Sequence, residues 1–70
     1  KRLAAYLADE YVKLGSDVIS TTHEQIAKNL GTAREVVSRM LKYFEKEGLV
    51  ALGRGTITIK NVSGLKKLLT

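Results

Sequence analysis

The sequence predicts one small domain that is mainly α-helical and includes a small antiparallel β-hairpin. Residues 2–14 and 33–48 carry apolar side chains at intervals of three and four, which is the spacing of one helical face. Between them, a pair of threonines and Gly31 delimit a shorter helix with a start and a stop signal. After Gly48, two short apolar or alternating runs flank a Gly-Arg-Gly turn, as the strands of a hairpin do.

The composition favours a globular binding domain over an enzyme or a membrane protein. The chain has 70 residues, of which 44% are hydrophobic and 27% charged, enough for one modest core. It has no cysteine, one histidine and no paired carboxylates, so we expect no enzyme activity, metal or cofactor in this segment. No apolar run is long enough to span a membrane and no signal-peptide pattern is present, which predicts a cytoplasmic protein. The net charge of +5 suits a polyanionic partner.

The first helix is predicted over residues 2–14. Its inward stripe consists of Leu3, Leu7, Tyr11 and Leu14, with Ala4 and Ala8 beside them. Gly15 ends the helix because glycine tolerates the positive φ of a helix C-terminus. No capping residue precedes the helix, and Lys1 and Arg2 are already in helical phase. We therefore expect residues 1–70 to be one domain of a longer chain.

A pair of threonines begins the second helix. The two candidate capping boxes are Thr21 with Glu24 and Thr22 with Gln25. The inward residues of this helix are Ile26, Ala27 and Leu30. Gly31 ends the helix, and Thr32 is expected to cap the next one.

The third helix is predicted over residues 33–48 and has two different faces. Its inward face consists of Ala33, Val36, Val37, Met40, Leu41 and Phe44. Its outward face consists of Arg34, Glu35, Ser38, Arg39 and Lys42. The outward face is polar and concentrated in the first half of the helix, which suits insertion into the major groove of DNA.

Strands are predicted over residues 49–52 and 56–60, joined by a turn over 53–55, and residues 17–20 are a further extended candidate. Asn61 or Ser63 can begin a last short helix. Its inward residues are Leu65, Leu68 and Leu69, and its outward residues are Lys66 and Lys67. Three helices followed by a hairpin and a short C-terminal helix make a winged helix-turn-helix.

The outward residues of the third helix have the chemistry of base recognition. Glu35 and Arg39 lie one turn apart, at ~6 Å along the axis for ~1.5 Å per residue. Arginine matches the O6 and N7 acceptors of guanine and glutamate accepts from cytosine, so the two residues can read one G·C pair and hold each other in place. Ser38 can donate or accept, and Arg34 can reach a neighbouring guanine or a phosphate. The alternative is an exposed ion pair worth roughly 0.3–0.5 kcal/mol with no binding role.

A second set of residues is predicted to contact the DNA backbone. The set consists of Thr22, His23, Thr32, Lys42, Arg54 and Thr56. Thr22 and Thr32 are placed at helix N-termini, where free N–H groups and the helix dipole favour a phosphate. Arg54 lies at the hairpin tip, where the alternative is a solvated turn residue. His23 can approach the backbone, although simple exposure is the expectation for it.

Four runs resemble a known family. They are THEQIA at 22–27, LGTAREVVSR at 30–39, LK at 41–42 and EKEGLV at 45–50. Together they resemble the C-terminal DNA-binding domain of the Crp/Fnr regulators, over residues 3–59. The catabolite activator protein of this family is a known helix-turn-helix protein, so the docking of its second helix in the major groove is implied by the resemblance.

The resemblance implies specific roles and partners. The base-reading positions of the family fall on Arg34, Glu35 and Arg39, and Ser38 matches the serine of the fumarate–nitrate branch. Half-sites with a TGA-like core, arranged as an inverted repeat, are implied. The family also implies an N-terminal effector domain of cyclic-nucleotide-binding type, a dimerisation helix that makes a homodimer, and a loop at residues 13–18 that relatives use towards RNA polymerase.

Two departures from the family concern phosphate anchoring. The family usually has serine where this chain has Ala33 and threonine where it has Val36. Both hydroxyls can contact the DNA backbone in relatives, so we expect weaker anchoring here.

The residues are compatible with three functions. The first is sequence-specific DNA binding by a transcription regulator, the second a winged-helix module that binds protein, and the third a nonspecific nucleic-acid binder. The first function requires Arg34, Glu35 and Arg39 to be free of apolar neighbours on their face of the helix, which they are, and this favours it over the second. A base-reading Glu35 favours it over the third, because a purely electrostatic binder avoids a carboxylate that repels phosphate.

Overall fold

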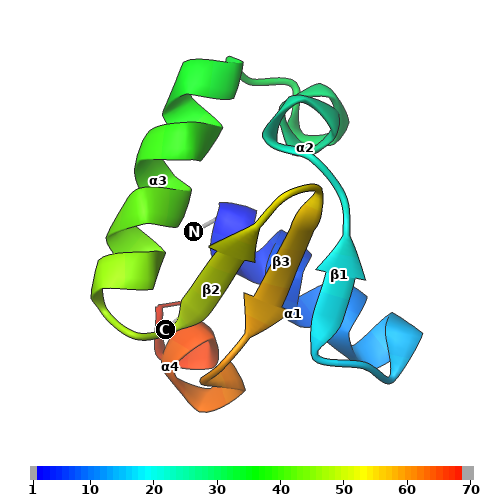
Figure 1. Cartoon of the computed structure of the whole chain (residues 1–70), viewed down its shortest axis with the longest axis vertical. Coiled ribbons are helices and arrows are strands. Elements are labelled where there is room, and N and C mark those ends of the chain that lie inside the picture. The colour runs from blue at the N-terminus through cyan, green and yellow to red at the C-terminus, as the bar shows by residue number, and fades with distance from the viewer. Residues whose placement is uncertain (1, 69–70) are drawn as a thin grey trace.

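Four helices surround a small antiparallel sheet in the computed structural model, which describes residues 2–68 (Figure 1). The elements are, in order, α1 (Arg2–Leu14), β1 (Val18–Ser20), α2 (His23–Leu30), α3 (Arg34–Lys46), β2 (Val50–Gly53), β3 (Thr56–Ile59) and α4 (Val62–Lys67). α3 runs along the β2 edge of the sheet, α1 lies behind the sheet, and α4 lies at the end opposite α2 (Figure 1). This arrangement confirms the predicted winged helix-turn-helix, with small differences at the ends of elements.

The sheet has three strands in the order β1-β3-β2. The predicted hairpin is confirmed: Gly53 pairs with Thr56, which leaves Arg54 and Gly55 as the turn, and Gly55 has a φ of 64°. The segment predicted as extended forms β1, which pairs antiparallel with β3. The sequence did not predict this pairing, because a local pattern does not specify which distant strand an extended segment will join.

The core lies between the helices and one face of the sheet, and no polar or charged side chain among residues 2–68 is buried in it. Its members are Leu3, Ala4, Leu7, Ile19, Ile26, Ala27, Val37, Leu41, Phe44, Leu49, Val50, Ile57, Ile59 and Leu65. The first helix contributes most of its predicted stripe, but the expectation for Leu14 was wrong because its side chain is 53% exposed. Leu14 is the last residue of α1, and the chain reverses at Gly15, which has a φ of 61°.

Thr22 caps the N-terminus of α2. Its Oγ1 accepts a hydrogen bond from the N–H of Gln25 at 3.1 Å, so the second of the two candidate capping pairs is the one that forms. Gln25 uses its own side chain elsewhere, because its Nε2 donates to Oδ1 of Asn29 at 3.3 Å. Only the capping half of the predicted box is therefore present.

Replacing Thr22 with alanine should lower the free energy of unfolding by about 1 kcal/mol, because the N–H of Gln25 loses its acceptor. Urea denaturation followed by circular dichroism measures this change. Thr21→Val is the matched control: the Oγ1 of Thr21 is buried without a hydrogen-bond partner among the described residues, so its removal should be neutral or stabilising. Equal losses in both variants would contradict the assignment of Thr22 as the cap.

The turn between α2 and α3 places Thr32 differently from the prediction, because its backbone N–H takes part in ending α2. Gly31 has a φ of 67°, its N–H donates to the carbonyl of Lys28 at 3.3 Å, and the N–H of Thr32 donates to that of Ala27 at 2.9 Å. These two bonds form a Schellman motif at the end of α2. Thr32 thus belongs to the preceding turn, and the N-cap of α3 is Ala33, which makes no side-chain capping bond. The prediction that Thr32 caps α3 was wrong.

The buried stripe of α3 is narrower than predicted. Val37, Leu41 and Phe44 are buried, whereas Val36 is 43% exposed and Ala33 is exposed at the N-cap. Val36 instead lines an apolar hollow of about 210 Å³ between α1, α2 and α3. The inward assignment of Ala33 and Val36 was therefore wrong.

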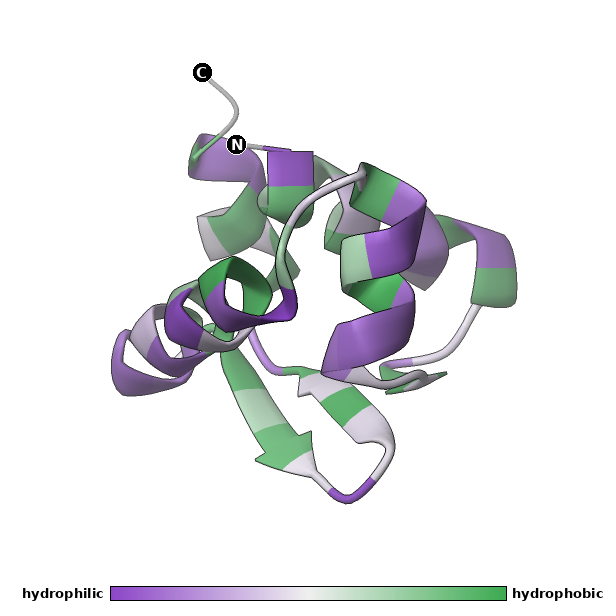
Figure 2. Ribbon diagram, turned by 90° about the horizontal axis from the view of Figure 1, so that it is seen from above, coloured by the Kyte–Doolittle hydropathy of each residue, from purple (hydrophilic) through white to green (hydrophobic). Residues whose placement is uncertain are grey.

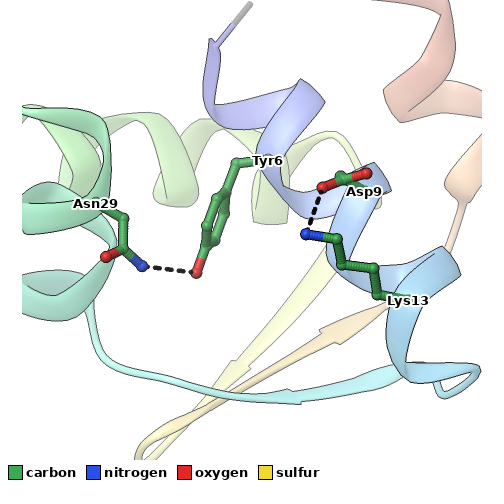
Figure 3. Close-up of polar contacts among 4 residues, drawn as sticks. All are labelled: Tyr6, Asp9, Lys13 and Asn29. Atoms are coloured by element: carbon green, nitrogen blue, oxygen red, sulfur yellow. Dashed lines mark hydrogen bonds and ion pairs between the residues drawn. The ribbon is translucent and has the colours of Figure 1, made fainter.

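Polar contacts fix α2 against α1. The guanidinium of Arg2 donates to the carbonyl of Leu30 at the C-terminus of α2. Nδ2 of Asn29 donates to the Tyr6 hydroxyl at 3.2 Å (Figure 3). Figure 3 also shows the ion pair of α1 between Lys13 Nζ and Asp9 Oδ2, which are 3.3 Å apart. Both side chains are mostly exposed, so the pair contributes little to the stability of the fold.

α4 closes the core at the end opposite α2. Asn61 is its cap, since its Oδ1 accepts from the N–H of Gly64 at 2.9 Å. Leu65 is buried as predicted, Leu68 is 36% exposed, and Leu69 lies outside the described residues. Among the helices of residues 2–68, none has the length and apolar character needed to cross a membrane.

Candidate nucleic-acid interface

The outer face of α3 presents charged side chains that form no ion pair with other residues of the segment 2–68. Arg34, Glu35, Arg39 and Lys42 are all exposed. Within residues 2–68 the only ion pair found joins α1 residues, so the expected mutual contact of Glu35 and Arg39 is absent. Their charged groups therefore remain available to an external partner, at the one-turn spacing that the sequence predicted.

Ser38 is held differently from these four residues. Its Oγ lies 2.8 Å from Nδ1 of His23, and both side chains are half-buried. The expectation that His23 is simply exposed was wrong, and Ser38 is less outward than predicted. The contact joins the first residue of α2 to the second turn of α3, and it forms because these helices pack against each other. Nothing in the local sequence signals it.

A hollow of about 310 Å³ brings together three of the six predicted backbone-contacting residues. Its walls come from the start of α2, the first turn of α3 and the hairpin. They include Thr22, His23, Arg34 and Thr56. An adjoining hollow is lined by Thr22, Arg34 and Thr32, so Arg34 lies where the two meet. Glu24, which the sequence analysis did not include in the site, lines both hollows and adds a carboxylate there.

The two helix N-termini beside these hollows differ in chemistry. At α2, the Thr22 Oγ1 already accepts from Gln25, but its O–H can still donate to an anion. At α3, Ala33 offers no capping oxygen, so the first-turn N–H groups have no side-chain partner. Both ends can therefore donate to a phosphate.

Arg54 and Lys42 lie outside the hollows. Arg54 is exposed in the turn of the hairpin, which projects from the domain and is hydrophilic at its tip (Figure 2). Lys42 is exposed on α3, two turns beyond its start. The structure thus separates the predicted backbone set into a compact group around Arg34 and two flanking cations.

Comparison with known proteins identifies the family. The sequence profile of the Crp-like helix-turn-helix domain matches residues 1–68. The chain belongs to this family. Its helix-turn-helix is the pair α2–α3, and its wing is the β2–β3 hairpin.

Individual relatives support the same family assignment. A crystal structure described as a transcriptional regulator of the Crp/Fnr family from Eubacterium rectale is 48% identical, with a TM-score of 0.92 over 96% of this chain and 31% of that one. The Thermus thermophilus catabolite activator protein is 32% identical, with a TM-score of 0.79 over 93% of this chain and 31% of that one. The transcriptional regulator SdrP of Thermus thermophilus is 33% identical over 54 residues, which are 77% of this chain and 27% of SdrP.

The chain spans less than one third of the length of each of these proteins. Membership of the Crp-like family makes it a DNA-binding domain of transcription regulation, in a family of regulators rather than of enzymes.

Proposed function

We propose that this Crp-like domain binds double-stranded DNA sequence-specifically, with α3 in the major groove of one half of an inverted repeat. The observation that supports this most is the set of exposed and unpaired charges on α3, namely Arg34, Glu35 and Arg39. Base edges in the major groove provide complementary donors and acceptors for these three side chains.

In this proposal Arg39 donates both arms of its guanidinium to a guanine, and Glu35 accepts from a cytosine amino group. Arg34 reaches a neighbouring guanine or a phosphate, and Ser38 contacts a further base. The family resemblance favours a TGA-like core in each half-site. Because Glu35 and Arg39 do not pair with each other, no ion pair between them has to be broken when DNA binds.

The backbone contacts surround this set. The residues proposed to contact phosphates are Thr22, His23, Thr32, Lys42, Arg54 and Thr56. The hollow shared by Thr22, His23, Arg34 and Thr56 supports a phosphate path between α2 and the wing. Thr32 contributes as a donor beside the α3 N-terminus, not as its cap.

The proposal extends to the protein that carries this domain. One recognition helix per chain binds weakly, so we propose a homodimer formed through a part outside these 70 residues. By resemblance, that part contains an effector domain for a cyclic nucleotide or another ligand. The exposed α1–β1 turn at residues 13–18 is proposed to approach RNA polymerase. The cytoplasm is the proposed location, and no enzyme activity is proposed.

Selection from a randomised DNA pool tests the proposal. The chain is joined to a dimerising coiled coil and equilibrated with the pool at moderate salt. Enrichment of an inverted repeat that contains a G·C pair, with loss of the preference for that pair in Arg39→Ala, supports base reading by α3. Salt-sensitive binding without any enriched sequence would instead favour a nonspecific binder, and no DNA binding would favour a protein-interaction module.

Arg54→Ala should weaken binding to cognate and scrambled DNA by the same factor, because a phosphate contact carries no sequence information. It should also reduce the slope of log K against log salt by about 1. Salt titrations by fluorescence anisotropy measure both quantities. Lys60→Ala, which removes an exposed charge beyond the end of β3, is the control and should leave the slope nearly unchanged. A loss confined to cognate DNA would show that the wing reads bases.

A further inference from the structure

We propose that His23 is a positioning residue that makes Ser38 a hydrogen-bond acceptor towards DNA, so that Ser38 selects a base with an exposed amino group. The inference rests on the proposed function above and adds a specificity rule to it. It starts from the 2.8 Å contact between Nδ1 of His23 and Oγ of Ser38.

Both ends of this contact are held by the fold. His23 is the first residue of α2, directly after the Thr22 cap, and Ser38 is in the second turn of α3. The Schellman turn at Gly31 and the packing of α2 on α3 set the distance between the two backbones. Both side chains are half-buried, which restricts their rotation while leaving one side of each accessible.

The serine hydroxyl has one hydrogen to donate and two lone pairs. If it donates to Nδ1 of His23, only lone pairs remain for a base. If it accepts from an Nδ1–H group, its own hydrogen stays free for a base acceptor. The tautomer of His23 therefore decides what Ser38 can recognise.

The surroundings of the ring favour one tautomer. The His23 ring lines the hollow shared with Thr22, Glu24, Arg34 and Thr56, where the proposed phosphate path runs. In the proposed complex, Nε2, the ring nitrogen that does not contact Ser38, donates to a phosphate oxygen, which can only accept, while the donor Arg34 binds the same phosphate. In a neutral imidazole the other nitrogen, Nδ1, is then an acceptor and takes the hydrogen of Ser38.

Ser38 is left with lone pairs, which fit the N6 amino group of adenine or the N4 amino group of cytosine in the major groove. They do not fit O4 of thymine or the O6 and N7 acceptors of guanine. A single hydrogen bond of this kind discriminates by roughly 3–10-fold. Without the His23 partner, the hydroxyl can turn to suit either kind of base.

The test uses the purified chain on duplexes with one half-site, in which the base pair whose preference Ser38→Ala abolishes is varied. The wild type should prefer an amino-bearing base there by roughly 3–10-fold, and His23→Ala should reduce that preference to less than about 2-fold. In the Ser38→Ala background, His23→Ala should have no further effect on base preference. Arg54→Ala, which removes a proposed phosphate contact in the hairpin turn, is the control and should lower affinity for all duplexes equally. Circular dichroism checks that each variant is folded.

A preference for thymine or guanine at that position, a preference that survives His23→Ala, or no position that responds to Ser38→Ala would each overturn the inference. A second set of half-site duplexes, in which the Arg39-dependent G·C pair is varied, reports on the proposed function separately. An intact Arg39-dependent G·C preference shows that base reading by α3 holds even if the rule for Ser38 fails. Loss of every base preference in the wild type would remove both.

Discussion

Arg39→Ala should weaken binding to a half-site with its cognate G·C pair by about 1–3 kcal/mol and abolish the preference at that pair. The guanidinium is exposed and has no partner within residues 2–68, so the fold loses nothing when it is removed. What is lost is a bidentate contact to O6 and N7 of guanine, whose two parallel hydrogen bonds discriminate against the other bases.

Anisotropy titrations on cognate and scrambled half-sites measure this effect. Arg39→Lys keeps the charge but lacks the planar fork, so it should retain affinity for scrambled DNA and lose most of the discrimination. Lys46→Ala removes one exposed charge from the last turn of α3 and should lower both affinities slightly and equally. Equal losses on both DNAs in Arg39→Ala would refute base reading by this residue.

Phe44→Ala should lower the free energy of unfolding by about 3–5 kcal/mol, the cost of deleting a buried aromatic side chain and leaving a cavity. Phe44 is 1% exposed and lies at the centre of the core beside Leu41 and Val37. A chain of 70 residues has a total stability of roughly 3.5–10.5 kcal/mol at 0.05–0.15 kcal/mol per residue. The substitution therefore removes a large part of it.

Thermal and urea unfolding measure the loss of unfolding free energy. Tyr43→Ala is the matched control because Tyr43 is the adjacent aromatic, 52% exposed, with its ring centroid 6.0 Å from that of Phe44. It should cost clearly less, since most of its surface is already in contact with water. Similar losses in the two variants would contradict the placement of the core.

Local signals in the sequence accounted for the helices, the hairpin and their ends. Gly31 and Gly48 signal the ends of helices in the sequence because glycine tolerates the left-handed conformation, and both adopt it in the structure, with φ of 67° and 76°. Thr21 and Thr22 were both candidate caps, and only the structure shows that Thr22 makes the capping hydrogen bond. The charged outer face of α3 was also predictable, because it is the complement of a regular apolar stripe.

By itself, then, the sequence determined the order of elements, the main core positions and the charged residues that α3 offers to DNA. These follow from interactions within one turn of helix or one hairpin, which repeat at known spacings. The tertiary structure decided the pairing of β1 with β3, the exposure of Val36, the role of Ala33 as N-cap and the absence of a Glu35–Arg39 pair. It also decided the contact of His23 with Ser38. Each of these depends on how distant segments or competing side chains meet in space, and spacing along one segment does not encode that.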